Sequence, residues 1–399
     1  MKNVVIVDCA RTAIGRMGGT LKKMTPVEMA GLTIKALVEK SRICEKGKVD
    51  AVFAGSAFGD VRALNFARNS ALSAGLPYET SATYVEMQCG SAIASINAAA
   101  LQIQDGLIET AIVGGAETYS QGYVKFSTST EPYKGIAPAA VPFRLAALDE
   151  DNISMIEISD LLAKKWGISR QQCDEFASRS QQLAARAIEN GYFEEEIVPV
   201  EIKDKKGQVV AVFNQDEHPR KDTTMESLAK LKTVYKDGVT TAGNASGRND
   251  GAAFVLMMSE DKANELGYEP YARWITGADV GVDPKLMGIA PAYSNLKILE
   301  RMKLDISDID IFECNEAFAA QNLAVIKEME RITGEKINMD NWNPNGGAIA
   351  FGHPNGASGA RICMFTMKEL ERRKGKYGLF SSCCGGGLGV STLIENCRR

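Results

Sequence analysis

Residues 49–55, Val-Asp-Ala-Val-Phe-Ala-Gly, have a counterpart at residues 309–315, Ile-Asp-Ile-Phe-Glu-Cys-Asn. Each stretch is a short apolar run that predicts a buried strand, and each stands between two amphipathic helical segments. Cys89-Gly-Ser-Ala and Gly356-Ala-Ser-Gly also match, because each opens a helix rich in small residues. These matching pairs indicate a chain made of two similar halves.

Further apolar runs alternate with helical segments on both sides of this repeat. The expected strands are residues 4–7, 51–55, 83–87, 110–113 and 252–258 in the first half, and 272–278, 308–314 and 378–383 in the second. Such alternation is typical of α/β folds and predicts a mostly parallel sheet. Residues 89–104 are apolar nearly all round, which predicts a helix buried in a layer between two sheets.

The alternating pattern breaks between the halves. Pro132, Pro138 and Pro142 punctuate a loop, and a polar helical stretch follows over residues 153–190. Because the expected strand 252–258 comes back to the first pattern, the interruption is read as an insertion in the first half. The predicted organisation is an N-terminal half of residues 1–117 plus 249–269, an inserted domain of residues 118–248, and a C-terminal half of residues 270–399.

Length and composition exclude several classes of protein. A chain of 399 residues is too long for one small core, and 45% hydrophobic with 24% charged residues excludes extended disorder. With 46 basic and 50 acidic residues the net charge is −4, and no basic tract predicts nucleic-acid binding. No apolar run approaches the length of a membrane span, and residues 4–7 are too short for the core of a signal peptide.

The cysteines point to a reducing compartment. There are nine, an odd number, and they are spread along the chain without the spacing of metal ligands. This pattern favours free thiols in a cytoplasmic protein without a bound metal.

The chain contains only two histidines, and their surroundings differ. His218 stands among Asp216, Glu217 and Pro219, which predicts a surface loop. His353 lies between glycine-rich segments, just before an expected helix. A single histidine is often structural, whereas this many glycines around one indicate backbone packed close to a ligand. Local sequence leaves both interpretations of His353 open.

Cys89 follows an expected strand and begins an expected helix. A helix N-terminus stabilises an anion, and that effect or a nearby protonated histidine brings the pKa of a thiol from about 8.5 towards 7. Cys89 is therefore a candidate nucleophile, and the alternative is a small buried apolar residue. Asn315, at the end of another expected strand, is either a site residue or simply a helix N-cap.

Residues 381–390, Ser-Ser-Cys-Cys-Gly-Gly-Gly-Leu-Gly-Val, place two adjacent cysteines before three glycines. Adjacent cysteines make a strained disulfide, and ordering three glycines costs backbone entropy. Either this is a solvent-exposed loop with an accidental pair of thiols, or the backbone must come very close to a reacting sulfur. Cys89, Asn315, His353 and Cys383 all lie at or just beyond expected strand ends, where α/β sheets collect their sites. One cysteine as nucleophile and a second as base is the logic of acyl transfer.

The motifs in this order resemble the thiolase family over nearly the whole chain. The matching stretches are Cys89-Gly-Ser, Thr241-Ala-Gly-Asn-Ala-Ser-Gly-Arg-Asn-Asp-Gly251, Asn315-Glu-Ala-Phe-Ala, residues 346–361 and Cys383-Cys-Gly-Gly-Gly-Leu-Gly389. The resemblance implies a duplicated αβαβα layered fold with an inserted loop domain that binds coenzyme A. It also implies reversible Claisen condensation of acetyl-CoA with an acyl-CoA, or thiolysis of a 3-oxoacyl-CoA, without a further cofactor. The expected assembly is a homodimer or homotetramer.

The same resemblance implies a role for each motif. Cys89 would be the nucleophile that carries the acyl group, and Cys383 would move the α-proton of acetyl-CoA. His353 would activate Cys89 and, with a water held by Asn315, stabilise the enolate. The N–H groups of Cys89 and Gly385 would form a second oxyanion hole.

Other positions match the family less closely or carry no role. Cys384 matches a variable position, and Arg220, Ser227 and Ser246 match contacts to coenzyme A. Many relatives have Asn where this chain has Glu86, and the acetoacetyl-forming group has His where this chain has Ser154. Residues 117–150, which in the family shape the acyl pocket and subunit contacts, match poorly.

Three alternatives remain at this level. A condensing enzyme of the ketoacyl-synthase type would use one cysteine with two histidines or a His–Asn pair. A non-catalytic acyl-CoA carrier would keep the fold but lack a catalytic residue. A redox protein would use Cys383 and Cys384, because vicinal thiols can respond to oxidants.

Overall fold

The computed structural model describes residues 1–131, 133–135 and 137–399. Eleven strands form one sheet, whose main path runs β11-β12-β13-β10-β1-β9-β5-β3-β4, with β2 beside β9 and β6 beside β1. The strands of the main path are β1 (Val4–Thr12), β3 (Ala51–Gly55), β4 (Ser81–Val85), β5 (Thr110–Glu117), β9 (Asn249–Ser259), β10 (Ala272–Gly281), β11 (Ile311–Cys314), β12 (Tyr377–Cys384) and β13 (Leu388–Asn396). The short strands are β2 (Gly15–Arg16) and β6 (Ile197–Val198).

The strand order confirms the duplication. Reading outward from the centre, one half runs β1-β9-β5-β3 and the other β10-β13-β12-β11. The two stretches matched by sequence, now β3 and β11, thus hold equivalent positions in the two halves. The halves join where β1 and β10 pair antiparallel over three residues each, beginning with Val4 opposite Trp274.

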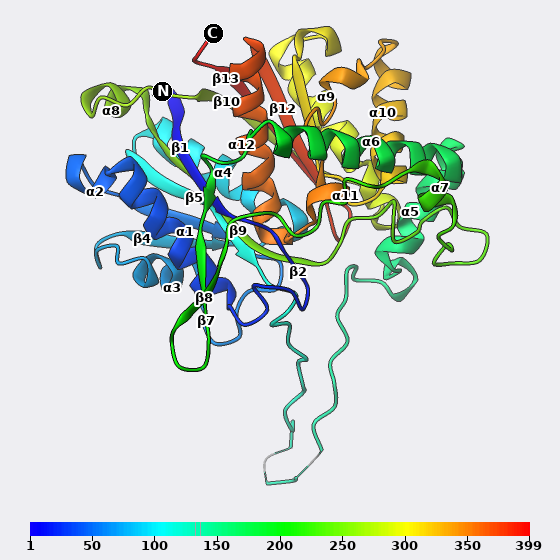
Figure 1. The fold of residues 1–399 in the computed structure, drawn as a ribbon, viewed down its shortest axis with the longest axis horizontal. Coiled ribbons are helices and arrows are strands. Elements are labelled where there is room, and N and C mark those ends of the chain that lie inside the picture. Colours follow the sequence, from blue (N-terminus) through cyan, green and yellow to red (C-terminus); the bar gives the residue numbers. More distant parts are fainter. Residues whose placement is uncertain (132, 136) are drawn as a thin grey trace.

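The helices make the remaining layers. α4 (Ser91–Asp105) and α12 (Asn355–Arg373) pack against each other and against strands of both halves, so they form the central layer. α1 (Pro26–Ser41) and α3 (Phe66–Ser73) cover the outer face of the first half, and α9 (Ala290–Met302) and α10 (Ala319–Thr333) lie on the outer side of the second (Figure 1). The expected αβαβα layering, with the helix after Cys89 at its centre, is confirmed.

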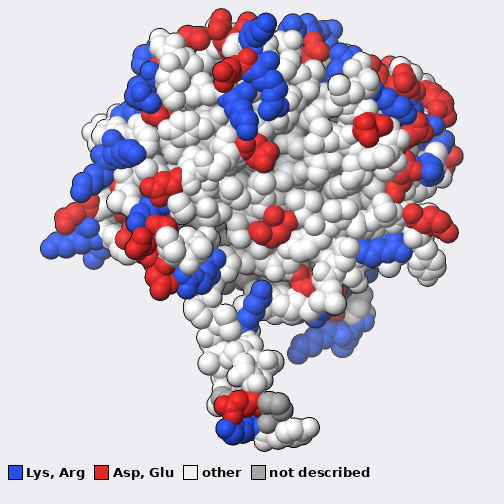
Figure 2. Space-filling view, turned by 180° about the vertical axis from the view of Figure 1, so that it is seen from behind, with Lys and Arg blue, Asp and Glu red and all other residues white. Residues whose placement is uncertain are grey.

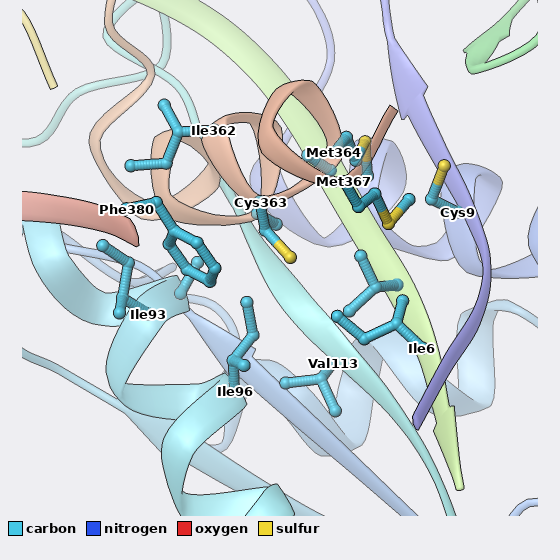
Figure 3. Packing of buried hydrophobic residues seen from close by; sticks show 14 of the residues in the cluster. Ile6, Cys9, Ile93, Ile96, Val113, Ile362, Cys363, Met364, Met367 and Phe380 are labelled. Carbon is cyan, nitrogen blue, oxygen red and sulfur yellow. The ribbon is translucent and has the colours of Figure 1, made fainter. Parts of the chain in front are cut away.

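The central layer buries the largest apolar cluster. Figure 3 shows Ile93 and Ile96 of α4 facing Phe380 of β12 and Val113 of β5, with the side chains of α12 above them. All of these side chains are buried completely or nearly so. Full burial of a branched or aromatic side chain contributes about 1.5–3 kcal/mol each, so this layer stabilises both halves at once.

The prediction of a mostly parallel sheet is wrong. Parallel pairing joins β3 to β4, β3 to β5 and β11 to β12, but β9 and β13 pair antiparallel with both of their neighbours. Helical crossovers produce the parallel pairs, whereas β13 follows β12 after a turn of three residues and therefore runs back. No strand was predicted at β13. A strand that follows β12 after a short turn would have indicated antiparallel pairing and so a mixed sheet.

Several predicted bounds shift by a few residues. The strand expected at 83–87 is β4, and the one expected at 308–314 begins with a 3₁₀ turn, Ile306–Asp308. The helix expected from Cys89 starts with a 3₁₀ turn, Gln88–Gly90, before α4. The stretch 153–190 is two helices, α5 (Met155–Trp166) and α6 (Arg170–Glu189), because Gly167 ends the first in a left-handed conformation.

The inserted segment also contains α7 (Met225–Ala229) and a hairpin of β7 (Val200–Lys203) and β8 (Val209–Phe213). The other helices are α2 (Ile43–Lys46), α8 (Glu260–Glu265) and α11 (Ala348–Phe351).

Between β5 and α5 the chain leaves the body as a long arm that projects downward in the view of Figure 1. Its two sides are linked by backbone hydrogen bonds from Ser127 to Ala139 and from Val141 to Lys125. Among the residues that the structure describes, no helix combines the length and apolar character needed to cross a membrane.

Candidate active site

The four residues singled out at strand ends come from both halves of the molecule. The turn Gln88–Gly90, which carries Cys89, packs against β12 and against α12. Asn315 directly follows β11, Cys383 is the next-to-last residue of β12, and His353 precedes α12. A backbone bridge also joins His353 to Arg248, just before β9. The structure therefore brings the ends of β11 and β12 to the helix start that holds Cys89.

Cys89 is held in a tight, buried turn. The Ser91 hydroxyl accepts from the N–H of Met87 at 2.9 Å and donates to the Gln88 carbonyl at 2.7 Å, which closes the turn below the thiol. Burial, with the charge of Glu117 as a second cause, raises the pKa of Cys89 to about 12. The expectation of a lowered pKa is wrong, because burial and the negative charges of Glu117 and Glu86 outweigh the backbone hydrogen bond that favours the thiolate. A base must take its proton as the reaction begins.

His353 lies just before α12, which packs against the turn that carries Cys89. Its side chain is 5% exposed, and burial, with the charge of Arg361 as a second cause, lowers its pKa to about 3. The imidazole is therefore neutral at physiological pH. Its Nδ1 lies 2.6 Å from the Ser358 hydroxyl, and its backbone N–H donates to Asn249 Oδ1 at 3.0 Å. The ring and the backbone of His353 are thus fixed separately.

Asn315 faces the other ring nitrogen. Its Nδ2 lies 3.4 Å from His353 Nε2, and its backbone N–H donates to the carbonyl of Ser381 at 2.9 Å. Asn315 Oδ1 is buried and has no hydrogen-bond partner among the described residues. A buried oxygen without a partner is costly unless water supplies a donor, which fits the expectation that Asn315 holds a water.

Cys383 and Cys384 lie on opposite faces of β12, as consecutive strand residues do. Cys383 belongs to the apolar cluster on the outer side of the second half, and Cys384 to the central cluster. Burial raises the pKa of both thiols well above the ordinary value, and the charge of a Cys89 thiolate would raise each further. Cys384 has a packing role, since a Cβ added to Gly90 would lie 2.5 Å from its sulfur.

The three glycines after the cysteines have different functions. Gly386 and Gly387, with φ of 84° and 88°, form the left-handed part of the turn between β12 and β13. Gly385 is instead tightly packed, because an added Cβ would meet Leu145 at 2.9 Å, Met155 at 3.2 Å and Gln88 at 3.3 Å. Gly385 therefore lies beside Gln88, the residue before Cys89.

The residues matched to coenzyme A contacts lie on the inserted segment. Arg220 is exposed, while the Ser227 hydroxyl takes part in the capping box of α7 with Thr224. Ser246 donates its backbone N–H to Ala317, two residues after Asn315, at 2.9 Å. Ser246 is the one of the three that lies beside the strand-end residues.

The two departures from the family are also placed. Ser154 is the N-cap of α5, and its hydroxyl lies 2.9 Å from that of Tyr235. Glu86 is exposed and accepts from the N–H of Gln88 at 2.7 Å.

The sequence reading missed Glu117, which is completely buried at the end of β5. Its carboxylate accepts from the N–H groups of Ala57 at 2.7 Å and Gly356 at 3.0 Å and from the Ser56 hydroxyl at 2.8 Å. Burial raises the pKa of Glu117 to about 7, although these donors oppose the shift. Glu117 ties the start of α12, and so His353, to the first half. A single acidic residue at a strand end gave no signal of this role.

The chemistry of this arrangement follows from its proton donors and acceptors. A neutral imidazole can take the proton of a thiol, and the resulting thiolate attacks the carbonyl of a thioester. A second buried thiol remains for another proton transfer. With the layered fold, this chemistry defines the chain as a cysteine-dependent acyltransferase.

Comparisons with known proteins identify which acyltransferase family this is. The sequence matches the family described as thiolase, N-terminal domain, over residues 4–261 and thiolase, C-terminal domain, over residues 268–396. It is 38% identical to an acetyl-CoA acetyltransferase of Syntrophomonas wolfei over 99% of each chain. It is 41% identical to a beta-ketoadipyl-CoA thiolase of Acinetobacter baylyi over 99% of this chain and 100% of that one.

Solved structures agree. The Bacillus anthracis acetyl-CoA acetyltransferase superposes with a TM-score of 0.91 at 40% identity, covering 99% of each chain. Human mitochondrial 3-ketoacyl-CoA thiolase in complex with CoA superposes with a TM-score of 0.88 at 35% identity, covering 99% of this chain and 98% of that one. The chain belongs to the thiolase family. It is an acyltransferase of the kind that forms and cleaves 3-oxoacyl thioesters by Claisen condensation and thiolysis.

Proposed function

We propose that this thiolase acts on short acyl groups, joining acetyl-CoA to a short acyl-CoA or cleaving the matching 3-oxoacyl-CoA. The observation that carries this proposal is the close packing over Gly385. Leu145 and Met155 approach the position of an added Cβ to 2.9 and 3.2 Å, so two apolar side chains lie directly over the glycine. A long acyl chain bound over Gly385 would have to displace both side chains.

The roles of the site residues are part of the proposal. His353 takes the proton of Cys89, the Cys89 thiolate displaces coenzyme A from a thioester, and Cys383 gives its proton to the departing thiolate. In the second half-reaction the Cys383 thiolate removes the α-proton of acetyl-CoA, and His353 with the water held by Asn315 stabilises the enolate oxygen. The enolate attacks the acyl group, and Cys89 leaves as a thiolate that takes its proton back from His353. The N–H groups of Cys89 and Gly385 receive the oxyanion formed at the acyl-enzyme.

The proposal requires no cofactor other than the thioester substrates. Arg220, Ser227 and Ser246 are proposed to contact coenzyme A, supported by their positions on the inserted segment and by the backbone bond from Ser246 to Ala317. Because all nine cysteines are free, we place the protein in the reducing cytoplasm, where it would serve the metabolism of fatty acyl chains.

We also propose a homodimer or homotetramer. β4 ends the sheet and pairs only with β3 among the described strands, so its outer edge is open to a second copy. Leu64 and Tyr78, which are 100% and 82% exposed, come shortly before β4 in the chain. Seen from behind the view of Figure 1, the molecule has a broad area with few charged side chains, which continues along the shaft of the arm (Figure 2).

The chemical proposal is tested by mass spectrometry with thiolysis assays. Acetyl-CoA should leave an acetyl group on the peptide that contains Cys89, and Cys89→Ser should abolish this adduct. Thiolysis should fall steeply with the length of the 3-oxoacyl chain, and Leu145→Ala should extend the range of accepted chains. An acetyl group on Cys383 instead of Cys89 would overturn the assignment of roles, and a preference for long chains would overturn the assignment of substrate.

A further inference from the structure

We propose that Ser358 is a positioning residue for His353, and that its hydroxyl accepts a hydrogen bond from Nδ1 while Nε2 faces the reacting groups. This inference rests on the proposed role of His353. Ser358 lies in the first turns of α12 and is completely buried. Its Oγ is 2.6 Å from His353 Nδ1, the shortest contact that either ring nitrogen makes.

The Ser358 hydroxyl can serve both its own helix and the ring. It donates to the carbonyl of Pro354, one turn back, at 3.1 Å, and its oxygen lone pairs stay free to accept from Nδ1. That carbonyl also accepts from the N–H groups of Ala357 at 2.9 Å and Ser358 at 3.0 Å. At 2.6 Å, the contact to Nδ1 is the shorter of the two that this hydroxyl makes.

Counting protons around the ring gives the resting tautomer. The amide Nδ2 of Asn315 is a donor and faces Nε2 at 3.4 Å, so Nε2 is the nitrogen that accepts. Nδ1 then carries the hydrogen of the neutral ring and donates it to Ser358 Oγ. In this tautomer Nε2 has a free lone pair, which is the form needed to take the proton of Cys89.

A hydroxyl also suits the second half-reaction. Stabilising an enolate oxygen needs a hydrogen on Nε2, which the ring holds once it has taken the proton of Cys89. Nδ1 keeps its own hydrogen and still donates it to Ser358 Oγ, so the same contact serves both half-reactions. A carboxylate in place of the hydroxyl would hold the imidazolium form and raise the pKa of His353. The neutral partner leaves the burial of the ring unopposed, in agreement with its pKa of about 3.

α12 itself offers a matched control. Thr366 is also completely buried, and its hydroxyl donates to the carbonyl of Ile362 one turn back, at 2.7 Å. Thr366→Val removes a buried hydroxyl from the same helix without touching His353. Ser358→Ala removes the hydroxyl that contacts the ring, and Ser358→Thr keeps a hydroxyl at that position.

Steady-state kinetics over pH 6–9 provide the first test. Ser358→Ala should lower kcat about 10–100-fold with little change in KM, because the ring loses its orientation while the substrate pocket is intact. Ser358→Thr should recover most of the rate, and Thr366→Val should stay within a few fold of the wild type. Wild-type kcat in Ser358→Ala, or an equal loss in Thr366→Val, would overturn the proposal.

Nitrogen NMR provides a readout that a purely structural effect would not move. The chain has only two histidines, so a His218→Asn background leaves His353 as the one labelled imidazole. We expect one protonated nitrogen, Nδ1, in this background and averaged tautomers once Ser358→Ala is added; unchanged ring shifts would contradict the inference.

His353→Asn distinguishes failure of the proposed function from failure of the role of Ser358. Full activity in that variant would remove the proposed function, whereas an inactive His353→Asn beside a fully active Ser358→Ala would remove only the role of Ser358.

Discussion

Cys383 and Cys384 are chemically identical neighbours that the strand directs into different surroundings. Cys383 enters the cluster beside Ala317 and Met287, and Cys384 packs below the turn that carries Cys89. Burial raises the pKa of both thiols, so burial does not distinguish the base from its neighbour. The distinction lies in which face of β12 meets the substrate.

Solvent deuterium exchange into acetyl-CoA separates the two thiols. Cys383→Ser should reduce exchange about 10²–10⁴-fold, because a hydroxyl is a far weaker acid–base group near neutral pH, while Cys89 is still acetylated. Cys384→Ser should exchange within a few fold of the wild type. Loss of exchange in Cys384→Ser alone would show that the opposite face of β12 carries the chemistry.

At the scale of residues, the sequence predicts those site residues that belong to rare residue types in unusual surroundings. One histidine among glycines and a cysteine at a helix start are unusual enough to be noticed in a sequence. Ser358 and Glu117 are common types whose importance depends on two contacts, 2.6 Å to Nδ1 and 3.0 Å to the Gly356 N–H. The direction of the Cys89 pKa shift was also out of reach, because burial depends on the whole fold.

Close packing between helices and strands explains glycines around His353, for which the sequence also allowed an interpretation as backbone packed close to a ligand. Gly356 lies where α12 crosses the first half, and an added Cβ would be 2.6 Å from Ser56 Cα and 2.7 Å from the Gly55 carbonyl. Gly359 is similarly close to Ile93 of α4. These glycines allow the central helix to pack against strand ends and the neighbouring helix, and this close packing places His353 at its position before α12.

Gly356→Ala should therefore destabilise the protein and lower its activity together. The clash is with backbone, which cannot move aside cheaply, so we expect a loss of about 1–3 kcal/mol in the free energy of unfolding. Gly281→Ala is the control, since an added Cβ there meets nothing within 4 Å. Denaturant titration of both variants measures the difference, and equal stability would show that the crossing has room to spare.

At the scale of elements, sequence periodicity identified the buried strands and helices but not their directions. β3 and β11 were placed by the repeat itself, and α4 by its apolar surface. β13 was not predicted, because its alternating polar and apolar residues directly follow three glycines that were interpreted as part of the candidate site. Strand direction depends on whether a helix or a three-residue turn connects two strands, and that requires both strands to be recognised.

The whole molecule responds to pH through its two histidines, His353, which is buried, and His218, which is half-buried. Burial lowers the pKa of His218 to about 4 and that of His353 to about 3, whereas an unfolded chain titrates near 6.5. Below pH 6.5 the unfolded state therefore binds more protons than the native state, and stability falls as the pH falls towards 4. Above pH 6.5 both states are neutral and the effect disappears. Glu117, with its pKa raised to about 7, acts in the opposite direction between about pH 7 and 4.5.

Comparison of the wild type with His218→Asn isolates the histidine effect, because Glu117 is common to both. The stability advantage of the wild type should shrink by about 1 kcal/mol for each pH unit between 6 and 4.5, since one shifted group contributes up to about 1.4 kcal/mol per unit. Denaturant titrations at pH 7.5, 6.0 and 5.0 measure this difference. A difference that does not change with pH would mean that His218 is hydrated in the native state.

Assembly and catalysis meet in the arm, which gives the last prediction. Val124 and Phe126 are 68% and 59% exposed on the outgoing side, and an isolated chain of this shape would leave them in water. The returning side ends near Leu145, whose side chain lies over Gly385. If a second copy also covers the arm, then assembly holds Leu145 in place.

Val124→Ser with Phe126→Ser should therefore lower the oligomer's mass in light scattering and, in the same protein, weaken the preference for short acyl chains. Leu107→Ser, which replaces a 71% exposed residue away from the arm, should change neither property. A double variant that keeps the native mass would place the subunit contact elsewhere, and one that loses mass but keeps its chain-length preference would show that the body of the molecule holds Leu145 unaided.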